Sequence, residues 1–211
     1  MLSKMILTFL QKLKTYPDLL KAEYPEMIKF LHRQGDLTLK KGFGNVPQDQ
    51  EACFAVEAEK HGFKFLAKGA TYSSDGCYYR YQLNGSQHSK DFALIEVVDG
   101  ISTEVEFELK STKGNLFYFN DGWFQSNVIY IVSYVQKKQN RIYIGYGEES
   151  YLENDNIAWN EIRSQIKEMN KLSKNTTFLK IYNRLANQYS CDQFTDEFCR
   201  EKFESIERRL A

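Results

Sequence analysis

The sequence lacks the features that mark several large classes of protein. It has three prolines in 211 residues, and no Ser/Gly/Pro-rich linker or low-complexity segment divides it. Its cysteines include no CxxC pair and its three histidines are scattered, so the usual spacing of zinc ligands is missing. Basic and acidic residues balance at 28 each, so the net charge neither supports nor excludes binding to nucleic acid.

Long hydrophobic runs are also missing. The N-terminal stretch MLSKMILTFLQKLKTY is too short in its apolar part to span a bilayer, and it has no small-residue cleavage site. We interpret it as a packing helix. Without paired cysteines, we expect reduced thiols in a cytoplasmic protein that has no membrane partner.

Aromatic residues, by contrast, make up 15% of the chain and can fill a substantial core. We predict a single α/β domain over residues 1–211, in which a central mixed sheet is flanked by helices. Residues 1–45 form a helical N-terminal extension, residues 46–146 the sheet core, and residues 147–211 a helical C-terminal region.

The apolar periodicity predicts the main elements of this domain. A helix is expected over 47–61, strands over 63–71, 77–83, 128–135 and 141–146, and helices from about 157 to 210. The polar and aromatic residues 115–125 indicate either a loop or a packed aromatic turn.

The most informative segment is residues 91–110, DFALIEVVDGISTEVEFELK. Its Asp99-Gly100 dipeptide suits a two-residue type I′ hairpin turn. With those two residues in the loop, Asp91 lies opposite Glu108, and Lys110 lies one step further on the same face. The opposite face of this hairpin is then apolar and is the expected core side, with Phe92, Leu94, Val98, Ile101, Val105 and Phe107.

Chance is a weak explanation for this arrangement. Among all lysines in the chain, only Lys110 has an Asp or Glu two residues before it, and it lies where the register also supplies Asp91. The alternative is a half-exposed strand with solvated charges, which alternating sequences often form.

These residues resemble the PD-(D/E)xK nuclease superfamily, and type II restriction endonucleases in particular. The segments YYRYQLNGSQHSKDF (78–92) and ELKSTKGNLFYFND (108–121) carry the likeness, which covers about residues 51–146. One departure is Lys90, at the position where the motif name has proline. The resemblance implies a restriction-endonuclease-like sheet, Asp91 and Glu108 as Mg²⁺ ligands, and Lys110 as the charged catalytic residue beside the nucleophile.

The resemblance suggests further site residues. In this superfamily a helix before the sheet often adds a glutamate, so Glu57 or Glu51 is a candidate, although either suits a surface role. Glu106 shares the face of Glu108 and is a candidate for a second metal site. Candidates for contact with DNA are Gln87, Ser89, Lys113, Asn120 and Gln125, some of which equally suit turns or aromatic packing.

Taken together, these residues and the resemblance that they carry imply a Mg²⁺-dependent type II restriction endonuclease that hydrolyses double-stranded DNA as part of a restriction-modification pair. Palindromic sites favour two-fold symmetry, so we expect a homodimer. Two alternatives stay open. One is a repair or junction-resolving nuclease of the same fold, and the other is a non-catalytic domain that binds DNA or protein.

Overall fold

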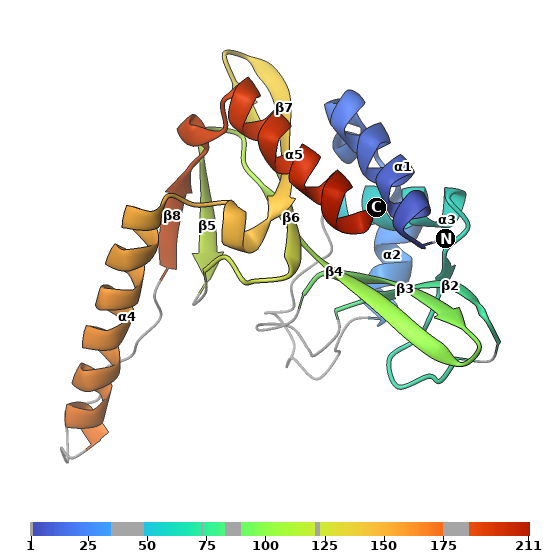
Figure 1. The fold of residues 1–211 in the computed structure, drawn as a ribbon, viewed down its shortest axis with the longest axis horizontal. Helices are drawn as coiled ribbons and strands as arrows, with labels where there is room; N and C mark the ends of the chain where they lie inside the picture. Colours follow the sequence, from blue (N-terminus) through green and yellow to red (C-terminus); the bar gives the residue numbers. More distant parts are fainter. Residues whose placement is uncertain (1, 35–48, 73, 83–89, 121–122, 175–185) are drawn as a thin grey trace.

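The computed structural model describes residues 2–34, 49–72, 74–82, 90–120, 123–174 and 186–211 (Figure 1). In chain order its elements are α1 (Leu2–Thr15), η1 (Pro17–Lys21), α2 (Pro25–Gln34), α3 (Asp49–Lys60), β1 (Lys64–Phe65), β2 (Gly76–Tyr81), β3 (Phe92–Val98), β4 (Ile101–Ser111), β5 (Leu116–Asn120), β6 (Val128–Gln136), β7 (Gln139–Tyr146), η2 (Gly147–Glu149), α4 (Glu153–Lys174), β8 (Ala186–Ser190), η3 (Cys191–Gln193) and α5 (Asp196–Leu210). No helix in these ranges is long and apolar enough to cross a membrane.

A mixed six-stranded sheet forms the centre of the described chain, in the order β1-β2-β3-β4-β6-β7. The β1–β2 and β4–β6 pairs are parallel, and the other neighbours are antiparallel. Helices α1, α3 and α5 supply residues to the core on one face of the sheet. The predicted α/β class, with a mixed sheet flanked by helices, is therefore confirmed.

The hairpin between β3 and β4 has the predicted register. Val98 pairs with Ile101 and Phe92 with Phe107. Asp99 and Gly100 both have positive φ, 52° and 74°, as a type I′ turn requires. The Asp75 carboxylate accepts hydrogen bonds from both of their backbone N–H groups and so holds the turn.

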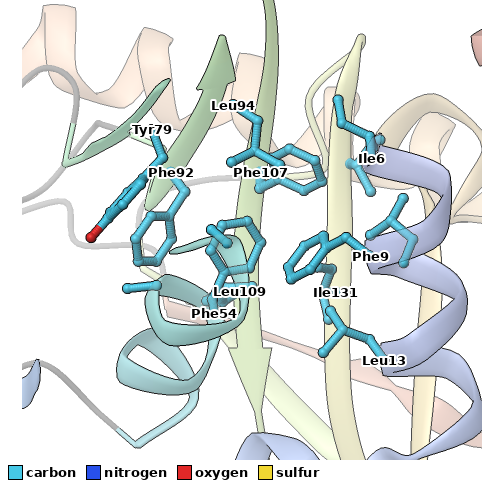
Figure 2. Packing of buried hydrophobic residues seen from close by; sticks show 14 of the residues in the cluster. Ile6, Phe9, Leu13, Phe54, Tyr79, Phe92, Leu94, Phe107, Leu109 and Ile131 are labelled. Atoms are coloured by element: carbon cyan, nitrogen blue, oxygen red, sulfur yellow. The ribbon is translucent and has the colours of Figure 1, made fainter. Parts of the chain in front are cut away.

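Aromatic stacking defines the main core, on the face where α3 meets this hairpin (Figure 2). The Phe54 ring of α3 stacks on Phe92 of β3 at 4.4 Å between centroids, and Phe107 lies 5.3 Å from Phe54. The predicted core face is therefore confirmed at the end of the hairpin away from the turn, where Phe92 and Phe107 are buried. It is wrong at the turn, where Val98 and Ile101 are exposed because the hairpin extends past the helices.

A second aromatic cluster covers the other face of β6. Alternate residues of this strand face opposite ways, so Ile129 and Ile131 join the main core while Tyr130 and Val132 join the second cluster. The small β5–β8 sheet packs there through Phe117, Phe119 and Tyr189. A strand that is buried on both faces explains the nearly continuous apolar sequence of β6.

Several predicted elements are wrong in detail. The expected strand over 63–71 is only β1, Lys64–Phe65, and a strand, β5, forms within the segment 115–125 that was expected to be a loop or turn. The C-terminal third is not wholly helical, because residues 186–190 form β8 and pair with β5. Residues 175–185, which belong to the helical region predicted from about 157 to 210, lie outside the described residues.

Candidate active site

The three residues singled out by the hairpin register lie where β4 runs on past the start of β3. Strand β4 pairs with β3 as far as Phe107 and continues to Ser111 paired with β6, where Glu108 lies opposite Tyr130. Asp91 immediately precedes β3. Because β3 begins only at Phe92, the sheet has a step at this point, and Asp91, Glu108 and Lys110 gather beside it.

A backbone hydrogen bond fixes Asp91 against β4. The N–H of Leu109, the residue between Glu108 and Lys110, donates to Asp91 Oδ2 at 2.7 Å. On the same strand, Lys110 Nζ donates to Glu108 Oε1 at 2.5 Å. The Glu108 and Lys110 side chains keep only 16% and 21% of their surface exposed, so the pair is partly shielded from water but still reachable.

Burial and neighbouring charges set the pKa values of Asp91 and Lys110. Loss of solvent, followed by repulsion from Glu108, raises the pKa of the Asp91 carboxyl well above its usual range, while Lys110 opposes the rise. Burial alone lowers the pKa of Lys110, but Glu108 and Asp91 outweigh it and raise that pKa overall. Lys110 is thus a permanent cation at neutral pH, whereas ionisation of Asp91 is unfavourable as long as no further positive charge lies beside it.

Lys90 adds a second ammonium group directly before Asp91, at the position where the sequence departs from the motif that it resembles. Its side chain is buried, and loss of solvent lowers its pKa, while Glu108 and Glu106 partly offset that change. Sequence reasoning treated Lys90 only as a departure from the motif. The signal it missed is that a lysine directly before Asp91 in an antiparallel pair lies close to the carboxylates of β4.

The structure favours Glu51, not Glu57, as the acidic residue contributed by α3. Tyr81 donates its hydroxyl hydrogen to Glu51 Oε1 at 3.3 Å, and the Glu51 charge contributes to the pKa shifts of Asp91 and Lys110. Glu57 is fully buried elsewhere and accepts from Lys12 and Lys60, each at 2.5 Å. Glu57 therefore links α1 to α3 as a structural anion, and its carboxylate is held by Lys12 and Lys60 and not by the predicted site residues.

Further acidic side chains lie along β4. Glu106 is half-buried and pairs across the sheet with Ala93, on the same face as Glu108. Burial, and then repulsion from Glu106, raises the pKa of Glu104, which is the next carboxyl along this face. The strand therefore presents a row of carboxylates, and Glu108 lies at the end of the row nearest to Asp91.

Aromatic side chains form one wall of the site. Lys110 Nζ lies 5.7 Å from the centre of the Phe119 ring of β5, a distance at which the ring face attracts the cation. Tyr130 of β6 is buried beside the carboxylates, and loss of solvent, followed by repulsion from Glu108, raises the pKa of its hydroxyl. This wall limits access of water to one side of the site.

The residues predicted to contact DNA are only partly placed. Lys113 and Gln125 are exposed, and Asn120 is the last residue of β5. Gln87 and Ser89 lie outside the described residues. The structure therefore shows Lys113 and Gln125 on the surface.

The oxygen donors of the site fit a small divalent cation. Within the described ranges, no group of three or more Asp, Glu, His or Cys side chains is arranged to hold a metal ion. Two carboxylates, those of Asp91 and Glu108, suit Mg²⁺ when water and a substrate phosphate complete the coordination. The raised pKa of Asp91 agrees with such a role, because a cation would compensate its charge.

Comparison of the chain with protein-family models, with curated proteins and with solved structures finds no match.

Proposed function

We propose that this protein is a Mg²⁺-dependent nuclease that hydrolyses phosphodiester bonds in double-stranded DNA. The observation that carries the proposal is the hydrogen bond from the Leu109 N–H to Asp91 Oδ2, because it holds that carboxyl beside both Glu108 and Lys110. Two carboxylates and one ammonium at the end of a sheet strand are the groups needed to neutralise a phosphate and direct water at it.

Asp91 and Glu108 are the residues that would hold the metal ion. When bound, Mg²⁺ supplies charge that polarises the phosphoryl oxygen and acidifies a water molecule. The hydrogen bond from Leu109 fixes one Asp91 oxygen and leaves the other available to a ligand. Lys110 contacts one Glu108 oxygen and so restricts the position of that side chain.

Lys110 is proposed to act as an electrostatic stabiliser and not as a general base. Its pKa is raised by Glu108 and Asp91 against the effect of burial, so it keeps its proton at neutral pH. A fixed ammonium group stabilises the charge that develops on the phosphorus oxygens as the water oxygen bonds to phosphorus and the ester P–O bond breaks. The products are a phosphomonoester and a hydroxyl group.

The more specific proposal is a type II restriction endonuclease with a restriction-endonuclease-like fold. The mixed sheet, the acidic α3 residue Glu51 and the motif hairpin support it. A palindromic target would be cut by two copies related by a two-fold axis, so DNA and a second subunit are the proposed partners.

Digestion of a long, unmethylated DNA of mixed sequence with purified protein and Mg²⁺ tests this proposal. A restriction endonuclease would give discrete fragments, and sequencing of their ends would reveal the recognition site. A repair or junction-resolving nuclease would instead cut branched DNA with little regard to sequence. A non-catalytic binding domain would leave every substrate intact, and that result would refute the proposal.

A further inference from the structure

Helix α4 carries an apolar face that the described part of the chain leaves uncovered. The helix has 22 residues and is about 33 Å long, and it extends away from the two sheets (Figure 1). Its first turns are anchored where Trp159 stacks on Trp123 at 5.3 Å and Tyr189 donates to Asp155 at 3.4 Å. Beyond Trp159, the residues of α4 whose burial is described are exposed or half-buried.

The uncovered face follows the spacing of a helix-pairing seam. Trp159, Ile162, Ile166 and Met169 recur at alternating steps of three and four, which places them on one side of the helix. Ile162 is 47% exposed and Met169 is 49% exposed. A helix of this length gains most of its stability by packing such a face, so the seam needs a partner.

The charges of α4 favour an antiparallel copy of the same helix as that partner. The first half, up to Arg163, has three acidic residues and one basic residue, a net charge of −2. Residues 164–172 have Lys167 and Lys171 against Glu168, a net charge of +1. Antiparallel pairing sets these unlike halves against each other, and it also aligns the two helix dipoles favourably. Parallel pairing would bring like charges together.

A groove beside the base of α4 fits this arrangement. It has a volume of about 480 Å³ and is lined by Trp123, Leu152, Ala158, Trp159, Ile162 and Tyr189, among others. Ile162 belongs both to this groove and to the seam. With Ile162 of one copy against Ile166 of the other, Met169 of the second copy reaches the groove near Trp159.

We propose that α4 is a homodimerisation helix that pairs antiparallel with α4 of a second copy, with Ile162 and Ile166 at the centre of the contact. The proposal does not depend on the nuclease function. A contact made mainly by two helices is small beside stable interfaces of roughly 1,200–2,000 Å², so we expect dissociation in the micromolar range.

Sedimentation velocity of the full chain over a range of concentrations tests whether this face of α4 forms a dimer contact. The parent should shift from the mass of one chain to twice that mass as concentration rises. The double variant Ile162→Glu/Met169→Glu should stay monomeric at every concentration, with unchanged circular dichroism because both side chains are exposed. Ile157→Glu is the matched control, since Ile157 is 58% exposed on the same helix but lies off the seam, and it should dimerise like the parent. A monomeric parent, or a double variant that still dimerises, would overturn the proposal.

Single cysteine variants test the direction of pairing. Under mild oxidation, a mixture of Ile162→Cys and Ile166→Cys should cross-link more than either variant alone. Parallel helices would cross-link each variant to itself equally well, and that result would contradict the antiparallel arrangement. The native thiols of Cys53, Cys77 and Cys191 are buried, but Cys199 is partly exposed and can add background cross-links. The parent protein, oxidised in the same way, measures that background.

Discussion

Asp91 carries a carboxyl group in a place where ionisation is unfavourable. The backbone N–H of Leu109 donates to Asp91 Oδ2 at 2.7 Å and holds the carboxyl in place, while burial and Glu108 raise its pKa. In a protein without a ligand, this arrangement lowers stability, because the folded state resists losing a proton that the unfolded state gives up readily. Such a cost is typical of a site shaped for a charged ligand.

The variant Asp91→Asn should therefore be more stable than the parent at neutral pH. Because the folded pKa of Asp91 lies above its unfolded value, the free energy of unfolding of the parent falls as pH rises through that interval, and asparagine removes the fall. We expect a gain of about 1 kcal/mol at neutral pH, and the difference between the proteins should widen as pH rises above the unfolded pKa of an aspartate, about 3.9. Urea denaturation at about pH 4 and at about pH 7 measures it. A variant less stable than the parent at the higher pH would contradict this explanation.

Lys110 should matter for the reaction and not for the fold. Removal of its charge in Lys110→Ala should slow DNA cleavage about 100- to 1,000-fold, the usual effect of losing one preorganised stabilising group. Lys110→Arg should recover only part of the rate, because a planar guanidinium replaces a compact ammonium. Initial rates at saturating DNA measure both, with Lys4→Ala on the exposed side of α1 as the control. Full activity of Lys110→Ala would exclude the proposed role.

Glu51 and Glu57 offer a paired comparison on one helix. Glu57→Gln should lower the free energy of unfolding by about 1–3 kcal/mol, since a buried carboxylate that accepts from Lys12 and Lys60 is lost. Burial opposes ionisation of Glu57, but the two lysines lower its pKa overall, so this stability is present at neutral pH and lost as pH falls through that lowered pKa. The cleavage rate of the folded variant should be unchanged.

Glu51→Gln should show the reverse pattern, with a rate reduced roughly tenfold and a smaller loss of stability. Chemical denaturation and initial rates on the same preparations separate the two effects. Equal rates for Glu51→Gln and the parent would remove Glu51 from the site.

At the scale of elements, the hairpin between β3 and β4 could be predicted because its register is a local property. The turn dipeptide Asp99-Gly100 and the alternation around it fix which residues pair, so Asp91 opposite Glu108 followed from the sequence. What could not be predicted is how far the covering helices extend. Val98 and Ile101 share the pattern of the core side and are nevertheless exposed.

Strands β5 and β8 escaped prediction because their pairing is not local. Leu116 pairs with Ser190 and Asn120 with Ala186, across a long separation in sequence. Short runs rich in aromatics do not reveal such a partner by periodicity. The sequence left the choice between Glu51 and Glu57 open for a related reason, because the rotation of α3 about its axis is set by the packing of Phe54 on Phe92.

Gly100 tests the contribution of the turn to stability. Its φ of +74° strains any side chain, while a Cβ there would meet no atom within 4 Å, so Gly100→Ala should cost about 1 kcal/mol from backbone strain alone. The matched control is Gly114→Ala, where φ lies outside the left-handed region and the nearest atom is Thr112 Oγ1 at 4.0 Å. Thermal unfolding of both variants measures the difference, and equal midpoints would argue against strain at the turn.

At the scale of the whole molecule, a balanced net charge coexists with a local excess of carboxylates near Asp91. A divalent cation bound there should stabilise the folded chain through mass action. At Mg²⁺ tenfold above its dissociation constant, we expect about 1.4 kcal/mol, which raises the midpoint of thermal unfolding by about 3–6 °C for a domain of this size.

The same Mg²⁺ titration on Asp91→Ala should give no rise, and neither should Na⁺ at matched ionic strength. This measurement needs no DNA and no activity. A rise of equal size in the variant would place the cation elsewhere on the molecule.

The most direct test of the proposed site is conversion of supercoiled plasmid to nicked and linear forms. The parent, Asp91→Ala and Lys110→Ala would be compared with Mg²⁺ and with chelator, after circular dichroism has confirmed that all three are folded. We expect Mg²⁺-dependent conversion by the parent and loss of that activity in both variants. A parent that leaves the plasmid supercoiled, or variants that cut as fast as the parent, would contradict it.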